Sequence, residues 1–208
     1  MNLIKEITRL YEDNVSSFGT NASLNFDFKQ QIKNAVKWYN GPLCRSYRAS
    51  YNSSSHHRYN QKIPDLLFHG TAYEFLSSIL SEGLVPNDNE VFLTDNILIA
   101  SIYANQSVHK AKVNKYPLIL IVDVRWLKNK LTPKLGCFYD PKYMTVSDYP
   151  IFPHWEFVYD KVIRRKRIAG DFVPPFYKQT VSMLISILKS IPDITPEEEF
   201  ELDYLKKI

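Results

Sequence analysis

One apolar run limits the fold of this chain more than any other feature of its sequence. Residues 118–124 read Leu-Ile-Leu-Ile-Val-Asp-Val, without the alternation of polar and apolar side chains that a half-exposed strand shows. Such a run is typical of a strand that is buried on both faces of its sheet. We therefore expect residues 118–124 to form a central strand inside an α+β domain that is flanked by helices.

Helices are expected on both sides of this strand in the sequence. Apolar residues recur at helical spacing over residues 2–12, 27–39, 97–107 and about 176–189. Asp95-Asn96 is expected to cap the third of these helices at its start. A last helix is expected to open at Thr195-Pro196-Glu197-Glu198, where proline stands in the first turn.

Three shorter stretches, residues 66–69, 90–94 and 156–163, predict further strands. The last of them alternates and is rich in Val, Ile, Phe and Tyr. Residues 131–155 hold five prolines and glycines and predict a long loop. The basic run over residues 164–167 is expected to extend the strand that precedes it.

These elements predict one compact domain in three parts. Residues 1–62 would form N-terminal helices and a polar, basic arm packed on the core, residues 63–170 the core itself, and residues 171–208 C-terminal helices. The arm, residues 44–62, interleaves arginine, lysine and histidine with tyrosine. A segment of this length without apolar periodicity is expected to be a long loop.

The composition favours a reducing compartment. The chain has 208 residues and only two cysteines, Cys44 and Cys137, which give neither a disulfide framework nor a zinc pattern. The first residues lack the apolar core of a signal peptide, and no apolar run is long enough to span a bilayer. We expect a cytoplasmic protein with no membrane association and no metal site, unless a secretion route that ignores signal peptides exports it.

A histidine at the end of a predicted strand is the first candidate for chemistry. His69 ends the strand over residues 66–69, and Gly70 would let a ligand approach the backbone closely. Thr71-Ala72-Tyr73-Glu74 matches a capping box, so we expect a helix to begin at Thr71. The first turn of that helix would offer free amides and a positive dipole end to an anion.

Two aromatic residues and a carboxylate complete the candidates. Phe92 lies on the strand over residues 90–94 and Tyr103 one helix later, so their rings could clamp a planar ligand. Glu156 opens a hydrophobic strand, where a carboxylate is costly unless it faces a cleft or is used. Each residue alone is more often a core or edge residue, but together they allow a nucleotide site.

The order and spacing of these residues resemble the ADP-ribosyltransferase superfamily, in particular diphtheria-type toxins and poly(ADP-ribose) polymerases. Those families carry His-Gly-Thr or His-Gly-Ser after a strand, a helix ending in Gly-Leu or Gly-Ile, an aromatic residue, and then a tyrosine in the following helix. The matching stretches here are His69-Gly70-Thr71, Gly83-Leu84, Phe92 and Thr94-Asp95-Asn96-x-x-x-Ala100-x-x-Tyr103. Trp155-Glu156-Phe157 is similar to the family's glutamate at the start of a late strand.

The resemblance covers about half of the chain and implies split central β-sheets with flanking helices and extra helices at both termini. It implies NAD⁺ as co-substrate: His69 would hydrogen-bond a ribose hydroxyl, and the Gly70 backbone would recognise the nicotinamide carboxamide. Phe92 and Tyr103 would sandwich the nicotinamide ring, although Phe92 stands where the family usually has tyrosine. Glu156 would bind the ribose 2′-hydroxyl and offset positive charge on the anomeric carbon. The remaining cofactor-binding candidates are Thr71, Thr94 and Asn96.

The activity implied is that of a mono-ADP-ribosyltransferase that breaks the nicotinamide–ribose bond and modifies a macromolecule. The net charge of +4, the basic arm and residues 164–167 slightly favour a nucleic acid over a protein side chain as acceptor. A small transferase of this kind resembles bacterial or phage toxins. A neutralising antitoxin or immunity partner is therefore expected.

Three other functions stay open. An NAD glycohydrolase would break the same bond with water as the acceptor. An RNA 2′-phosphotransferase shares the fold and the His-Gly-Thr motif, but that family places Arg-x-x-His after Gly-Leu, and residues 85–92 contain neither Arg nor His. A non-catalytic module could bind ADP-ribose or nucleic acid on the same scaffold, and binding of NAD⁺ without cleavage would reveal it.

Overall fold

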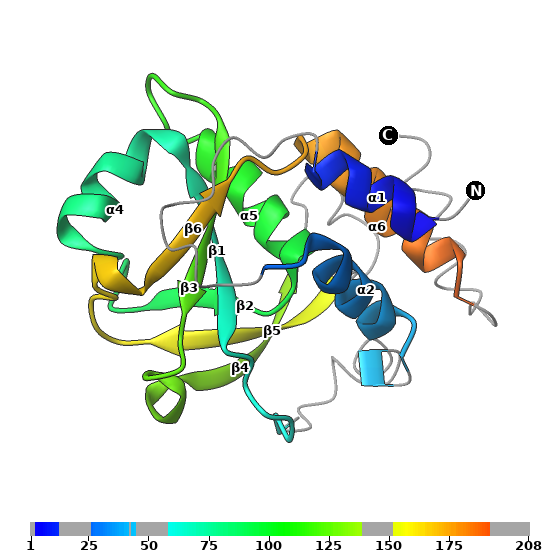
Figure 1. The fold of residues 1–208 in the computed structure, drawn as a ribbon, viewed down its shortest axis with the longest axis horizontal. Coiled ribbons are helices and arrows are strands. Elements are labelled where there is room, and N and C mark those ends of the chain that lie inside the picture. The colour runs from blue at the N-terminus through cyan, green and yellow to red at the C-terminus, as the bar shows by residue number, and fades with distance from the viewer. Residues whose placement is uncertain (1–2, 13–25, 42, 45–57, 139–151, 192–208) are drawn as a thin grey trace.

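The computed structural model describes residues 3–12, 26–41, 43–44, 58–138 and 152–191. Within these ranges the chain forms an α+β fold with five α-helices and a six-stranded antiparallel sheet (Figure 1). The helices are α1 (Leu3–Glu12), α2 (Phe28–Tyr39), α4 (Leu76–Glu82), α5 (Ile97–Val108) and α6 (Tyr177–Lys189). The strands are β1 (Leu66–Ala72), β2 (Val91–Thr94), β3 (Pro117–Asp123), β4 (Thr132–Phe138), β5 (Phe152–Tyr159) and β6 (Ile168–Phe172).

The strands lie in the order β4-β5-β2-β1-β3-β6. The predicted central strand is confirmed, because β3 lies between β1 and β6 and all seven of its residues are buried. β1 pairs with β3 along its whole length, from Leu66↔Asp123 to Ala72↔Pro117. By contrast, β1 pairs with β2 at Phe68↔Thr94 alone. The sheet is thus continuous, but its two halves are joined by a short junction between β1 and β2.

The alternating side chains of β3 enter two separate apolar clusters, one on each face of the sheet. Ile119 and Ile121 pack with residues of α1, α2, α5 and α6. Leu118, Leu120 and Val122 pack instead with Ile79 of α4 and with residues of β2 and β5. In Figure 1, α4 accordingly lies at one side of the sheet, and α1, α2 and α6 lie together at the other.

α5 is the central helix of the fold. The predicted cap is confirmed at Asn96, whose side chain accepts from the backbone N–H groups of Leu98 and Ile99 at 3.1 and 3.3 Å. Hydrogen bonds that are fully or partly buried tie both terminal regions to α5. Ser101 Oγ lies 2.5 Å from the hydroxyl of Tyr11 in α1, and Asn105 Oδ1 accepts from the amide of Tyr177 in α6 at 2.9 Å.

A helix does end just before Gly83, but its predicted start at Thr71 is wrong. β1 continues through His69 and Thr71 to Ala72, because its partner β3 is long enough to pair with each of these residues. A 3₁₀ turn (Tyr73–Phe75) follows, and α4 begins only at Leu76, without a side-chain cap. Glu74 accepts from the amides of Lys112 and Val113 instead. No capped helix start therefore follows the histidine.

The prediction of a loop over residues 131–155 is wrong at both ends of that range. β4 occupies its first part, and β5 begins at Phe152, so Glu156 lies within a strand rather than opening one. Pro133 is compatible with β4 because this strand forms one edge of the sheet. The basic run does not extend β5 as expected, because β5 ends at Tyr159 and the run ends in a 3₁₀ turn (Arg165–Arg167). No clear sequence pattern predicted β6, the short strand at the other edge.

Two further expectations lie outside the described residues: most of the basic arm, at residues 45–57, and the helix expected to open at Thr195. The described part of the chain contains no helix with both the length and the apolar character needed to cross a membrane.

Candidate active site

A cavity of about 760 Å³ opens between α4, the separating ends of β1 and β2, and the C-terminal half of α5. This volume is within the range of small-molecule sites, roughly 300–1,000 Å³. The cavity gathers predicted site residues from three distant segments, and we call it the His69–Glu156 cavity. Those residues are His69, Gly70, Thr71, Phe92, Thr94, Tyr103 and Glu156.

His69 lies where β1 and β2 separate. A regular antiparallel ladder continued from Phe68↔Thr94 would set Gly70 opposite Phe92. Instead, the carbonyl of Phe92 accepts a hydrogen bond from His69 Nδ1 at 2.9 Å. The imidazole thus bridges the two strands where the backbone pairing stops, and the cavity opens at this point.

The protonation state of His69 follows from its surroundings. Burial lowers its pKa below the ordinary value of 6.5, so the ring is neutral near pH 7. A carbonyl can only accept, so the single ring proton lies on Nδ1 and Nε2 is left as an acceptor. A hydroxyl group of a ligand in the cavity could donate to that nitrogen.

Glu156 is held by two neighbouring side chains on the face of β5 toward α5. Its Oε1 accepts from the Tyr103 hydroxyl at 2.8 Å and from His154 Nε2 at 3.1 Å. The Tyr103 hydroxyl also lies 3.2 Å from His154 Nε2, which closes a triangle of three polar groups. Only 16% of the Glu156 side chain is exposed. The carboxylate is therefore fixed in position and largely shielded from water.

This arrangement keeps Glu156 ionised. Burial alone raises the pKa of the carboxyl, but the hydrogen bond and charge of His154, together with Tyr103 and Lys134, lower it by more. The net effect is a pKa below the ordinary value of 4.5. A fixed, charged and poorly hydrated carboxylate is suited to stabilise positive charge that develops on a ligand.

Gly136 makes room for this carboxylate. A Cβ atom at position 136 would lie 2.6 Å from Glu156 Cδ and 2.8 Å from its Oε1. The adjacent strand β4 therefore needs glycine where the Glu156 side chain crosses it. Lys134 stands opposite Glu156 in the register of the same strand and forms an ion pair with Glu90 at 2.6 Å.

Three residues around Glu156 are not predictable from the motif, namely Gly136, Lys134 and His154. His154 could have been found by strand alternation, because residues 154 and 156 share a face once the strand begins before Glu156. The five prolines and glycines concealed that start. Gly136 and Lys134 carry no such signal, since only the pairing of β4 with β5 brings them to Glu156.

The walls of the cavity are mixed in character. Phe92 is 43% exposed on β2, so its ring is available for a planar ligand to cover. Ile79 and Phe75 supply apolar surface from α4 and the turn before it. Glu82 and Lys110 also line the cavity, and Lys110 is the only Lys or Arg among its described lining residues.

Two of the predicted site residues have structural roles. A Cβ at Gly70 would lie 2.3 Å from the Ala100 carbonyl oxygen and 2.5 Å from the Ala104 amide, so glycine is needed here for α5 to pack against β1. Asn96 does not line the His69–Glu156 cavity, because its side chain caps α5 at the opposite end of the helix. The structure therefore does not bring Asn96 together with the other predicted site residues.

Among the described residues, no group of three or more His, Cys, Asp or Glu side chains is arranged to hold a metal ion. Searches of protein-family models and of curated proteins return no match to this chain.

Proposed function

We propose that this chain is an ADP-ribosyltransferase that cleaves the nicotinamide–ribose bond of NAD⁺ and transfers ADP-ribose to a macromolecular acceptor. One observation carries the proposal. His69, Phe92, Tyr103 and Glu156, chosen from sequence for this chemistry, line one cavity in which Glu156 is held as a charged group. The split-sheet architecture of that superfamily is supported by the single pairing of β1 with β2 and by the cavity at their separation.

The proposed roles follow the contacts of each residue. His69 accepts from a ribose hydroxyl through Nε2, because Nδ1 is engaged by the Phe92 carbonyl. The ring of Phe92 stacks on the nicotinamide, and Tyr103 both closes the opposite side and orients Glu156 through its hydroxyl. Glu156 accepts from the ribose 2′-hydroxyl and stabilises the oxocarbenium-like anomeric carbon as nicotinamide leaves.

A nucleic acid is the acceptor that the sequence slightly favours, and a protein side chain is the next candidate. Of the basic residues that favour a nucleic acid, the described run Arg165–Arg167 lies in the turn that precedes β6. An RNA 2′-phosphotransferase is less well supported, because that chemistry depends on several arginines and the described lining of the cavity contains none.

The decisive experiment measures nicotinamide release from NAD⁺ by the wild-type chain and by Glu156→Gln. Removal of one group that stabilises transition-state charge is expected to lower kcat by about 10²–10³ while the circular dichroism spectrum is unchanged. Asp160→Asn is the matched control, because Asp160 is exposed just beyond β5 and does not line the cavity. Equal rates for Glu156→Gln and wild type would refute the proposal.

The acceptor is identified with labelled NAD⁺ and a cell extract. Label that nuclease removes and protease leaves supports a nucleic-acid acceptor, and the reverse result supports a protein. Free ADP-ribose as the sole product would identify a glycohydrolase. Binding of NAD⁺ without any nicotinamide release would identify a non-catalytic binding module instead.

A further inference from the structure

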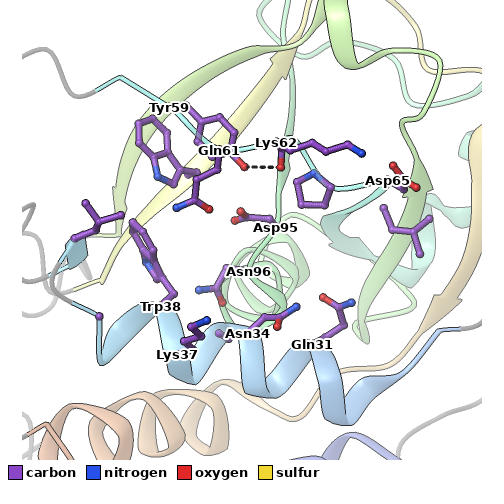
Figure 2. A pocket seen from close by; sticks show the side chains of 16 residues that line it. Gln31, Asn34, Lys37, Trp38, Tyr59, Gln61, Lys62, Asp65, Asp95 and Asn96 are labelled. Carbon is purple, nitrogen blue, oxygen red and sulfur yellow. Dashed lines mark hydrogen bonds between the residues drawn. The ribbon is translucent and has the colours of Figure 1, made fainter.

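A second cavity, of about 660 Å³, lies at the N-terminal end of α5 (Figure 2). Its lining comes from α2, from residues 59–66, from Asp95 and Asn96, and from Trp155 of β5. We call it the aromatic cavity. The His69–Glu156 cavity contacts α5 through its second half instead, so the two cavities lie toward opposite ends of one helix.

Three aromatic side chains give the aromatic cavity its flat surfaces: Trp38, Tyr59 and Trp155. The Tyr59 ring packs edge-on against Trp155 with ring centroids 5.0 Å apart. Trp38 donates through Nε1 to the Pro153 carbonyl at 3.0 Å, which fixes its indole. Rigid aromatic surfaces in a cavity of this size suit a planar ring system better than a flexible chain.

Asp95 lies in the middle of this cavity. Figure 2 shows its carboxylate between α2 on one side and the segment of Tyr59, Gln61 and Lys62 on the other. Burial raises the pKa of Asp95 to about 6. Burial, and then the negative charge of Asp95, raise the pKa of the Tyr59 hydroxyl. Among the described residues no cation forms an ion pair with Asp95.

A carboxylate in these surroundings is costly unless donors reach it. Three amide side chains surround it: two from α2 and one from the segment over residues 59–66, namely Gln31, Asn34 and Gln61. Lys37 and Lys62 also line the cavity, and both are exposed. The cavity thus combines a flat apolar surface, a central acceptor, and positive charge at its outer part.

We propose that the aromatic cavity binds a guanine base, with Asp95 accepting from its N1–H and 2-amino groups. Guanine is the one standard RNA base whose Watson–Crick edge presents two adjacent N–H donors, which match the two oxygens of a carboxylate. Adenine and cytosine offer one amino group beside an acceptor nitrogen, and uracil offers one N–H between two carbonyls. The aromatic rings stack on the base, and Lys37 and Lys62 neutralise the phosphate of the nucleotide that carries it.

This site requires neither NAD⁺ nor turnover, so it is tested separately from the proposed transferase activity. Intrinsic tryptophan fluorescence is a selective readout, because Trp38 and Trp155 line the aromatic cavity and no tryptophan lines the His69–Glu156 cavity. Titration of the full chain with GMP is expected to change this fluorescence. The affinity for GMP is expected to exceed that for AMP, CMP or UMP by roughly tenfold or more.

Asp95→Asn is the diagnostic variant, since it keeps the shape and removes the charged acceptor. It is expected to weaken GMP binding by roughly tenfold or more and to abolish the preference for guanine. Asp160→Asn, which replaces an exposed carboxylate outside both cavities, is the matched control and keeps wild-type affinity. Trp38→Ala removes a stacking surface and is expected to weaken binding of GMP as well.

The source of the base is resolved with a second titration, using a single-stranded oligonucleotide that contains one guanine among adenines. Tighter binding of this oligonucleotide than of GMP assigns the site to a nucleic acid, and the opposite order assigns it to a free nucleotide. Equal affinity for all four nucleotides, no response to GMP, or an Asp95→Asn variant that binds GMP like the wild type would each overturn the proposal.

Discussion

Each of the two cavities contains one largely shielded carboxylate, and the charge of His154 acts on both, yet their pKa values move in opposite directions. The pKa of Glu156 is lowered below 4.5, although burial opposes that change. The pKa of Asp95 is raised from 3.8 to about 6, because burial outweighs its backbone hydrogen bond and the attraction of His154.

The pKa values of Glu156 and Asp95 move in opposite directions because the two carboxylates differ in hydrogen bonding, not because they differ in distance from water. Oε1 of Glu156 accepts from Tyr103 and His154, and glycine at position 136 leaves room for that geometry. No side chain among the described residues donates to Asp95. The two proposals require this contrast, because a carboxylate that stabilises positive charge must be ionised in advance, whereas one that recognises N–H donors must keep its oxygens open to the ligand.

The largest expected effect comes from Asp95→Asn, measured as the free energy of unfolding against pH. The folded-state pKa of Asp95 lies above its unfolded value of 3.8, so the native state is favoured when the group is protonated, and that advantage is lost as pH rises toward about 6. The asparagine variant is neutral at every pH. It should match the wild type near pH 4 and be more stable at pH 7 by on the order of 3 kcal/mol.

Urea unfolding at several pH values between 4 and 7.5 provides this measurement. A matched control is Asp160→Asn, which replaces an exposed carboxylate and should leave the difference near zero throughout. If Asp95→Asn gave no gain in stability at pH 7, Asp95 would be well solvated or paired, and the contrast with Glu156 would disappear.

The next effect concerns Gly136→Ala, which should damage catalysis while sparing the fold. The added methyl group would stand within 2.9 Å of three Glu156 side-chain atoms, so the carboxylate must leave its position against Tyr103 and His154. Misplacement of a reacting group by about 1 Å commonly costs roughly 100-fold in rate. The thermal midpoint should change little, because only a side chain has to move.

A double variant tests whether Gly136 acts through Glu156. Added to Glu156→Gln, the alanine should cause almost no further loss of activity, since the two changes remove the same function. Independent, multiplicative losses would show that the alanine disturbs the cavity by another route. A collapse of the thermal midpoint would show that β4 itself does not tolerate the methyl group.

How far the sequence predicted this molecule depended on whether the signal was local. β3, α5, its Asn96 cap and the strand of Phe92 each follow from a contiguous pattern, and all were predicted. His69, Phe92 and Tyr103 could be grouped because the three residues lie in one continuous stretch with a recognisable spacing. Glu156 could be added to this group from its local context, but its place within β5 could not be predicted.

The failures involve contacts between segments that are far apart in the chain. Pairing with β3 extends β1 through Thr71, although residues 71–74 match a helix cap locally. Pairing with β5 makes a strand of β4 despite its proline and glycine. The aromatic cavity combines Trp38, Asp95 and Trp155 from three regions, so no window of sequence could have indicated it.

The smallest effect expected is that of Tyr103→Phe, which separates the two roles proposed for this residue. The ring is kept for stacking, but the hydroxyl that donates to Glu156 at 2.8 Å is lost. One hydrogen bond to a charged group corresponds to roughly a tenfold fall in kcat/KM. Because the hydroxyl is one of the groups that lower the pKa of Glu156, the acid limb of the pH profile should also move to higher pH. A reduced rate with an unshifted acid limb would mean that Tyr103 serves the ligand alone, and that His154 and Lys134 keep Glu156 charged without it.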